Sequence, residues 1–104
     1  MLNVNKVILG GTVYNVKEST TKNGKQVARF TITTWSRKGE GKDDVAIFHE
    51  CCCYGAKAAV ILKYVKNKDL IFLEGEINQF ENKEGKRVSN VIVHEFNFVE
   101  KKSA

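Results

Sequence analysis

The residues best suited to binding chemistry lie in one short run, residues 48–55, which reads Phe-His-Glu-Cys-Cys-Cys-Tyr-Gly. If this run is a β-strand, its side chains alternate between two faces, so Phe48 and Tyr54 share a face with Glu50 and Cys52. Two aromatic rings on an outer face are unusual unless a ligand stacks on them. Nucleic-acid bases are the usual ligand, because every base offers a flat face. The run therefore indicates a base-stacking surface, with packing of the rings in a core or a subunit contact as the alternative.

The opposite face of this run carries His49, Cys51 and Cys53, a set that could bind a metal ion. Zinc needs about four converging ligands, whereas side chains two residues apart on a straight strand lie about 6–7 Å apart. We therefore expect no metal and no cofactor, and we predict that the two thiols are small core residues. Neighbouring strand residues also have the wrong geometry for a disulfide, so all three cysteines are predicted to be reduced.

The acidic residues and the sequence motifs give no indication of catalysis. The sequence has no nucleophile elbow, no P-loop and no H-E-x-x-H pattern. A nuclease would need clustered carboxylates to hold a metal ion, and only Asp43 and Asp44 are adjacent, in a charged stretch. The protein is therefore predicted not to be an enzyme.

Length and charge favour one basic domain with a polyanionic partner. The 104 residues suffice for a single core, expected over residues 1–100 and followed by a short polar end at 101–104. Lysine and arginine outnumber aspartate and glutamate by 17 to 12, a net charge of +5. The sequence has neither an apolar run of about 18 residues nor a signal segment, so a cytoplasmic, nucleoid-associated location is expected.

The alternation of apolar and polar residues predicts five strands and one short helix. Asn23 and Gly24 form a strong hairpin-turn signal, and Gly10 and Gly11 predict a bend in the first strand. This order of elements is typical of an all-β, five-stranded OB-fold barrel with one short helix between strands three and four. The strands are expected over residues 4–16, 26–35, 45–54, 70–80 and 87–99, and the helix over residues 56–66.

Residue parity within these strands separates core positions from surface positions. Trp35 is the last residue on the polar face of the second strand. Its ring either packs under the following loop or contacts a ligand. In the fourth strand Phe80 falls among polar residues, so its ring is predicted to face outward. A break in the alternation of the last strand predicts a β-bulge near His94 and Glu95. The core set of the second strand is Ala28, Phe30 and Ile32.

The first strand is apolar on both faces, with Val7 and Leu9 on one face and Val4 and Ile8 on the other. One small barrel can bury only one of these faces, so one pair should meet another copy of the chain. A homo-oligomer is therefore predicted, with a tetramer favoured and a dimer as the alternative.

Several short motifs occur in a characteristic order, namely residues 4–9, Asn-Gly followed by residues 27–31, residues 48–55, residues 64–66 and residues 73–75. Together they resemble the bacterial-type single-stranded DNA-binding proteins over nearly the whole chain. The resemblance implies an OB-fold in which three or four aromatic rings stack on bases, and by position Phe48, Tyr54 and Phe80 match three of them. It also implies that the first strand pairs across subunits, with His49 beside the contact.

The sequence departs from the pattern of that family at several positions. Trp35 precedes the position of the usual loop tryptophan, which falls near Lys38, and Glu50 stands where the family usually has a basic residue. The basic stretch before the third stacking aromatic is also short, so attraction to phosphates should be weakened. The chain ends at residues 101–104 without an acidic tail, and docking of repair and replication enzymes through such a tail is not expected.

The residues and the resemblance together predict sequence-independent binding and protection of single-stranded DNA in replication, recombination and repair. The alternative is a tail-less OB-fold adaptor of the primosomal replication-restart type, in which protein contacts matter more than coating. The candidate DNA-binding residues are the aromatics Phe48, Tyr54, Phe80 and Trp35 and the basic residues Lys6, Arg29, Arg37, Lys38, Lys57, Lys83, Lys86 and Arg87. The candidate oligomer-interface residues are Val4, Val7, Ile8, Leu9 and His49.

Overall fold

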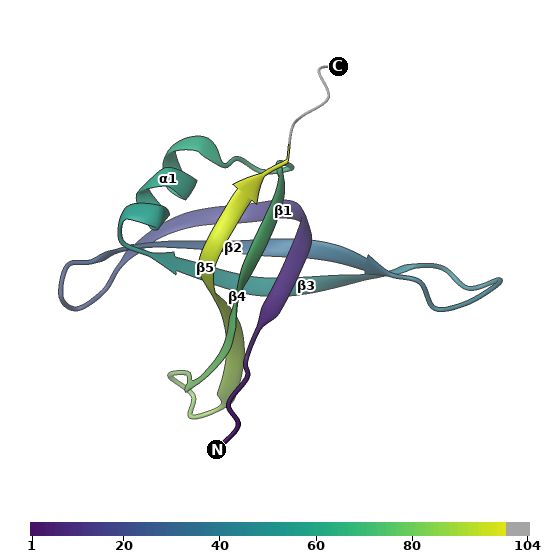
Figure 1. The fold of residues 1–104 in the computed structure, drawn as a ribbon, viewed down its shortest axis with the longest axis horizontal. Helices are drawn as coiled ribbons and strands as arrows, with labels where there is room; N and C mark the ends of the chain where they lie inside the picture. The colour runs from purple at the N-terminus through teal and green to yellow at the C-terminus, as the bar shows by residue number, and fades with distance from the viewer. Residues whose placement is uncertain (100–104) are drawn as a thin grey trace.

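The computed structural model describes residues 1–99, which contain five β-strands and one α-helix (Figure 1). These elements are β1 (Val7–Thr20), β2 (Gln26–Ser36), β3 (Val45–Tyr54), α1 (Ala56–Tyr64), β4 (Leu70–Glu81) and β5 (Arg87–Phe98). The strands form a closed barrel in the order β1-β2-β3-β5-β4. This architecture confirms the predicted five-stranded OB-fold barrel with one short helix between the third and fourth strands. The polar end predicted at 101–104 lies outside the described residues.

Most elements have nearly the predicted bounds. β3 matches the prediction, and β2, β4 and β5 each differ from it by one residue at one end. The predicted hairpin turn connects β1 to β2, with Gly24 at a positive φ of 82° and its amide donating to the carbonyl of Thr21 at 2.9 Å. Local alternation and turn chemistry were therefore sufficient to place these elements.

β1 is the strand that joins the two sides of the barrel, because it pairs first with β4 and then with β2. The change of partner occurs at Thr12, next to Gly10 and Gly11, where the sequence predicted a bend. Gly11 also allows β1 and β2 to approach closely, since a Cβ there would overlap the carbonyl oxygen of Thr33. A short parallel pairing of β3 with β5 closes the barrel.

The prediction that β1 begins at residue 4 is wrong, because the strand begins at Val7. Before Val7, the side chain of Asn5 makes the hydrogen bonds to the backbone of β4 that a strand would make with its own backbone. Its Nδ2 donates to the carbonyl of Ile77 at 2.8 Å, and its Oδ1 accepts from the amide of Ile77 at 2.9 Å. The N-terminal segment therefore stays beside β4 without belonging to the sheet, as Figure 1 shows.

The predicted end of β1 is also wrong, since the strand continues past Val16 to Thr20. Asn15 has a left-handed backbone with a φ of 58°, and the register against β2 shifts between Tyr14 and Lys17. This irregularity lets the pairing continue into polar residues, which carry no apolar pattern to indicate a strand.

The helix α1 ends at Tyr64, earlier than the predicted end at residue 66. Val65 already has an extended backbone, with φ −91° and ψ 129°, and its amide donates to the carbonyl of Ile61 at 2.8 Å. The predicted apolar face is present, because Ala58, Ile61 and Val65 are all buried. The helix packs mainly against β2 and β3 and covers one side of the core.

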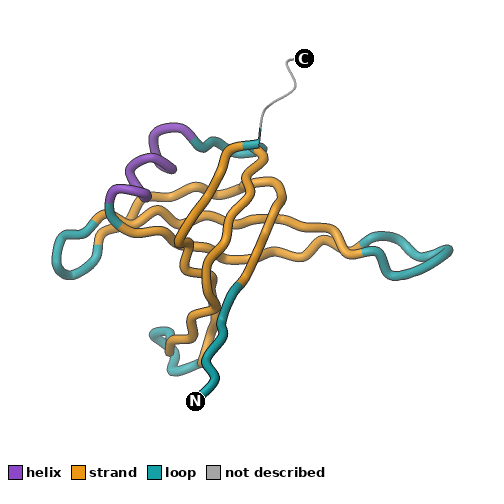
Figure 2. Tube along the Cα trace, viewed as in Figure 1, coloured by secondary structure: helices purple, strands orange, loops and turns teal. Residues whose placement is uncertain are grey.

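The barrel core consists largely of the residues that parity predicted, since Phe30, Ile32, Ile71 and Leu73 are all at most 2% exposed. Ile77 is the exception, because it has the parity of the core positions of β4 but is 50% exposed. Figure 2 shows the reason: β4 and β5 continue beyond the barrel as a projecting hairpin. Side chains on both faces of that hairpin meet solvent.

The predicted bulge in β5 is confirmed and falls at His94, which the register of β5 against β4 skips. The shift places Phe96 against the core, which explains the change of parity in the sequence. Gly75 of β4 lies opposite the bulge. A Cβ there would overlap the carbonyl oxygen of Ile92, so the two strands approach more closely than a side chain would permit.

Candidate nucleic-acid interface

The outer face of the barrel carries three shallow depressions over β1, β2 and β3. The first lies between Trp35 and Phe48 and has a volume of about 330 Å³. The second lies beside Lys17 and has a volume of about 350 Å³. The third, of about 170 Å³, lies beside Phe80 at the edge of β5.

Neighbouring depressions share lining residues, so they form one continuous path. Asn15 and Thr31 belong to the first and the second depression, and Arg29 and Glu50 belong to the second and the third. We call this path the outer groove. It is lined by Tyr14, Asn15, Lys17, Arg29, Phe30, Thr31, Thr33, Trp35, Ala46, Phe48, Glu50, Cys51, Cys52, Phe80, Val88, Ser89 and Asn90.

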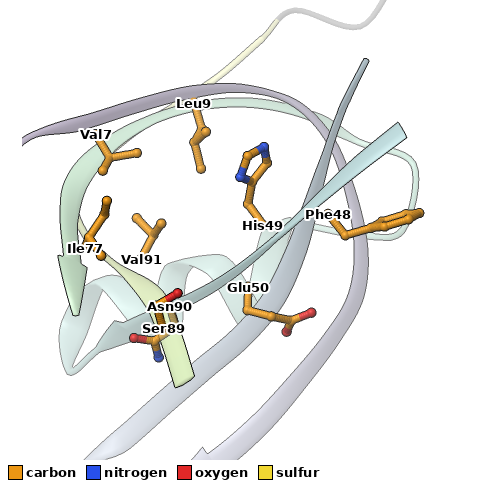
Figure 3. A pocket seen from close by; sticks show the side chains of 9 residues that line it. All are labelled: Val7, Leu9, Phe48, His49, Glu50, Ile77, Ser89, Asn90 and Val91. Atoms are coloured by element: carbon orange, nitrogen blue, oxygen red, sulfur yellow. The ribbon is translucent and has the colours of Figure 1, made fainter. Parts of the chain in front are cut away.

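Three of the four predicted aromatic rings line the outer groove. Trp35 and Phe48 are each 67% exposed, and Phe80 is 41% exposed. Figure 3 shows Phe48 on the opposite side of β3 from His49, as strand alternation requires. Tyr54 is 39% exposed and stands on the same face of β3, beyond the groove lining. The rings are therefore not core residues of this barrel, and the loop after β2 does not cover Trp35.

Cys52 connects the outer groove to Tyr54 through hydrogen bonds. The thiol of Cys52 donates to the hydroxyl of Tyr54 at 3.6 Å, and Nδ2 of Asn90 donates to Sγ of Cys52 at 3.4 Å. Parity places Cys52 on the outward face of β3, but β5 packs against it and leaves it 3% exposed. The hydrogen bond from Cys52 raises the pKa of Tyr54 above its usual value, and burial adds to the rise. The tyrosine is therefore neutral near pH 7.

The middle of the outer groove contains both basic and acidic side chains. Lys17 and Arg29 are paired in the register of β1 and β2, both are exposed, and neither forms an ion pair within residues 1–99. Glu50 lies beside them, and one of its carboxylate oxygens accepts a hydrogen bond from Oγ1 of Thr31 at 3.1 Å. The carboxylate reduces the positive potential where a phosphate would lie.

Two predicted basic residues lie outside the outer groove and pair with acids. Nζ of Lys6 lies 3.3 Å from a carboxylate oxygen of Glu74. Nζ of Lys57, on α1, lies 3.2 Å from a carboxylate oxygen of Glu95 and donates to the carbonyl of His94. The structure therefore does not bring these two lysines together with the aromatic rings.

The remaining predicted basic residues lie in the two projecting loops. Arg37 and Lys38 follow β2, and Lys83 and Lys86 belong to the turn that joins β4 to β5, with Arg87 directly after it. All five are exposed. Figure 2 shows both loops extending away from the barrel, in different directions. They flank the groove rather than line it.

The predicted interface residues near the N-terminus separate into two groups. Val7 and Leu9 line the mouth of the barrel together with His49, around a cavity of about 350 Å³ (Figure 3). Leu9 is 9% exposed and belongs to the core, and Nε2 of His49 lies 2.9 Å from Oγ1 of Thr34. The outward pair, Val4 and Ile8, is 80% and 57% exposed.

The three cysteines are free and buried, and their chemistry is that of core residues. Cys51 and Cys53 belong to the core cluster, as predicted. Burial is the main cause that raises the pKa of Cys51 to about 12, so its thiol is neutral near pH 7. Within residues 1–99, no group of three or more His, Cys, Asp or Glu side chains is arranged to hold a metal ion.

Sequence reasoning missed one aromatic and one basic side chain of the outer groove, Tyr14 and Lys17. Tyr14 pairs with Thr31 in the register of β1 and β2, which places its ring on the same outer face as Phe48. Tyr14 and Ile8 both occupy even positions of the first strand, so strand alternation places the ring of Tyr14 on the same outward face as Ile8. Lys17 had no such signal, because the irregularity at Asn15 changes the parity of the residues that follow.

A five-stranded barrel with a helix after the third strand and exposed rings over its middle strands defines an OB-fold of the kind that holds single strands. The model of the single-strand binding protein family matches residues 4–99. The chain therefore belongs to the single-strand binding protein family, and this membership implies binding of single-stranded DNA. No curated protein matches the chain. Among residues 1–99, no helix is long and apolar enough to cross a membrane.

Proposed function

We propose that the protein binds single-stranded DNA without sequence preference, with the strand lying along the outer groove. The observation that carries this proposal is that exposed rings stand at both ends of one continuous groove, with basic side chains between them. Phe48, Phe80 and Tyr54 would stack on bases, and Lys17 and Arg29 would contact phosphates. Each stacked base contributes about 1–3 kcal/mol whatever its identity.

Coating of exposed strands would serve DNA replication, recombination and repair. The basic residues of the two projecting loops would extend the contact beyond the ends of the groove. The cytoplasmic, nucleoid-associated location expected from the sequence follows from this proposal and stays a prediction.

A binding titration with fluorescently labelled poly-dT tests the proposal directly. Binding should saturate at a fixed number of nucleotides per chain, because the strand occupies a groove of defined length. A duplex of the same length should bind far more weakly, since its bases are not free to stack. Equal affinity for the duplex, or no affinity for poly-dT, would contradict the proposal.

The adaptor function remains the second candidate, and the position of Glu50 is the observation that favours it. A carboxylate beside Arg29 in the middle of the groove lowers the attraction for a phosphate backbone. An adaptor would bind poly-dT weakly and without saturating coverage, so the same titration separates the two functions.

Reversing the charge in the middle of the groove should strengthen binding. For single strands, the logarithm of the affinity falls with the logarithm of the salt concentration, with a slope of about −0.7 per phosphate neutralised. Glu50→Lys should raise the affinity for poly-dT and make this slope steeper by about 0.7, because the new lysine can neutralise one more phosphate. Glu95→Lys, on the face that carries Lys57, is the control and should leave the slope nearly unchanged. An unchanged slope in Glu50→Lys would place the strand path elsewhere.

We also propose that copies of the chain associate through outward side chains of β1 and of the segment just before it, with a tetramer favoured and a dimer as the alternative. Val4 and Ile8 are the exposed apolar pair of this region, whereas Leu9 is used by the core. A partner placed there would lie near the barrel mouth and His49. Several barrels in one assembly would allow a long strand to wrap around it.

Ile8→Asp should divide this assembly into smaller units, because it places a charge in an apolar contact. Affinity for long strands should then fall more than affinity for short strands, since linked sites gain affinity by binding the same strand. Sedimentation measures the assembly, and Val60→Asp, an exposed apolar position on α1, is the matched control. A wild-type protein that sediments as a monomer at micromolar concentration would contradict the proposal.

A further inference from the structure

The projecting part of the β4–β5 hairpin has a short backbone connection to β3. In the part of the chain that the structure describes, β5 pairs with β3 at two positions, Cys51–Val91 and Cys52–Ile92. Beyond them the hairpin extends away from the barrel (Figure 2). This extension carries Phe80. The backbone ladder to β3 therefore does not reach the part of the hairpin that holds this ring.

A chain of side-chain hydrogen bonds continues where the backbone pairing with β3 ends. Nδ2 of Asn78 on β4 donates to Oδ1 of Asn90 on β5 at 3.3 Å. Nδ2 of Asn90 donates to Sγ of Cys52 on β3 at 3.4 Å, and the thiol donates to the hydroxyl of Tyr54 at 3.6 Å. We call these four residues the amide–thiol link. It connects three strands through side chains alone.

The amide–thiol link is shielded from water, which strengthens its hydrogen bonds. Cys52 is 3% exposed, and Asn78 and Asn90 are half-buried although much of the hairpin around them meets solvent. Each amide donates through its nitrogen toward β3, and the thiol accepts one hydrogen bond and donates another. An apolar side chain at Asn90 or Cys52 would therefore break the connection between the hairpin and β3.

The amide–thiol link stands next to the ring of Phe80. Asn78 and Phe80 are two residues apart on β4, so they share a face of the hairpin, and their partners on β5 are Asn90 and Val88. Phe80, Asn90 and Cys52 all line the third depression of the outer groove, of about 170 Å³. A movement of the hairpin away from β3 would therefore carry Phe80 away from the groove.

We propose that the amide–thiol link holds the projecting hairpin against β3 and thereby keeps Phe80 over the outer groove. Asn90 and Cys52 are then positioning residues, which act on the bound strand through the placement of Phe80. The effect on DNA rests on the proposed function, whereas the restraint on the hairpin is a property of the free protein. The two parts can therefore be tested separately.

Modification of Cys52 by N-ethylmaleimide tests the restraint in the free protein. The buried thiol can react only when the hairpin opens away from it. Asn90→Leu keeps a side chain of similar size over the thiol but cannot donate to it, so modification should become at least about twofold faster, the effect of losing one hydrogen bond. Loss of the donor also makes the thiol less acidic, which by itself would slow the reaction. A faster reaction therefore reports opening.

Gln79→Leu is the matched control for this measurement, because Gln79 is exposed and occupies the neighbouring position of β4, on the other face of the hairpin. It should leave the rate of modification at the value of the wild type. Tandem mass spectrometry assigns the modification among the three adjacent cysteines. Cys51 and Cys53 belong to the core cluster and should react no faster in Asn90→Leu.

Cys52→Val and Cys52→Ser separate the hydrogen bonds of the thiol from its packing. Valine is apolar, whereas serine keeps a hydroxyl that can accept from Asn90 and donate to Tyr54. Cys52→Val should lower the affinity for labelled poly-dT about two- to tenfold, and Cys52→Ser should stay within about twofold of the wild type. The salt dependence should be unchanged in both, because no phosphate contact is altered.

A double-mutant cycle measures whether the amide–thiol link acts through Phe80. In a Phe80→Ala background, Cys52→Val should change the affinity by less than about twofold, because the ring that the link positions is absent. Phe48→Ala is the control background, since Phe48 stands in a different depression. There the full loss caused by Cys52→Val should remain.

Three results would overturn the proposal while leaving the proposed function intact. Equal rates of modification in Asn90→Leu and the wild type would overturn the restraint on the hairpin. Wild-type affinity in Cys52→Val, or an equal loss with and without Phe80, would overturn the positioning role. Failure of labelled poly-dT to bind the wild-type protein would overturn the proposed function and the effect of the link on DNA, and the modification rates would still decide the restraint.

Discussion

The double variant Phe48→Ala/Phe80→Ala should bind poly-dT at least about a hundredfold more weakly than the wild type, with each single variant weaker by about tenfold. The two rings stand in different depressions of the outer groove, so each should stack on a different base. Base stacking contributes about 1–3 kcal/mol per ring, and about 1.4 kcal/mol corresponds to a factor of ten in affinity. Titration of labelled poly-dT at a fixed salt concentration measures the loss.

Folding of these variants should be almost unaffected, because both rings are substantially exposed. Phe72→Ala is a matched control: Phe72 is 47% exposed, close to the 41% of Phe80, but it pairs with Gly10 and Asn97 away from the outer groove. Its affinity for poly-dT should equal that of the wild type. Loss of cooperative thermal unfolding in the Phe48 and Phe80 variants would instead identify the rings as structural.

Tyr54 should behave differently from the two phenylalanines, because its hydroxyl accepts a hydrogen bond from the thiol of Cys52. Its ring stands at the end of β3 beyond the lining of the groove, so its contribution to binding should be the smallest of the three. Both features depend on how β5 packs against β3. Parity alone gives Tyr54 the same role as Phe48.

The exposed and buried sets of β3 could be predicted because a strand has a strict period of two. Once Cys51 and Cys53 are assigned to the core, Phe48 and Tyr54 must face outward, and the structure has this arrangement. The same reasoning located the bulge in β5, since a change of parity needs an extra residue. The order of the elements along the chain followed from the alternation and the turn signals.

Features that depend on distant segments could not be predicted in this way. Parity cannot show that β5 covers Cys52, nor that β4 extends beyond the barrel and exposes Ile77. The partner of Lys6 is on β4 and that of Lys57 is on β5, so their ion pairs become visible only when the barrel is closed. These pairs explain why two predicted phosphate contacts lie away from the groove.

The site was predicted less completely than the fold for the same reason. The middle of the outer groove depends on Asn15, whose positive φ accompanies the register shift that places Lys17 opposite Arg29 of β2. A positive φ at a residue other than glycine is uncommon, and nothing in the local sequence required it here. The sequence therefore identified the rings on β3 and β4 but missed the β1 side of the groove.

Gly75→Ala should destabilise the fold by about 3 kcal/mol and lower the melting temperature by about 10–20 °C. A Cβ at Gly75 would overlap the carbonyl oxygen of Ile92 and approach the backbone of Val93, and backbone atoms cannot rotate away as a side chain can. The strands would have to separate at the bulge, where β4 and β5 hold the barrel together. A loss of this size is a large part of the about 5–15 kcal/mol that stabilises a typical domain.

Gly10→Ala is the matched control for this prediction, because it makes the same substitution on the neighbouring strand. A Cβ at Gly10 would lie 3.3 Å from Cδ2 of Phe72, and that exposed ring can move. The stability of Gly10→Ala should therefore change by less than about 1 kcal/mol. Thermal unfolding followed by circular dichroism compares the two variants. Equal melting temperatures for Gly75→Ala and the wild type would show that β4 and β5 can separate at the bulge at little cost, contrary to the close approach described for Gly75.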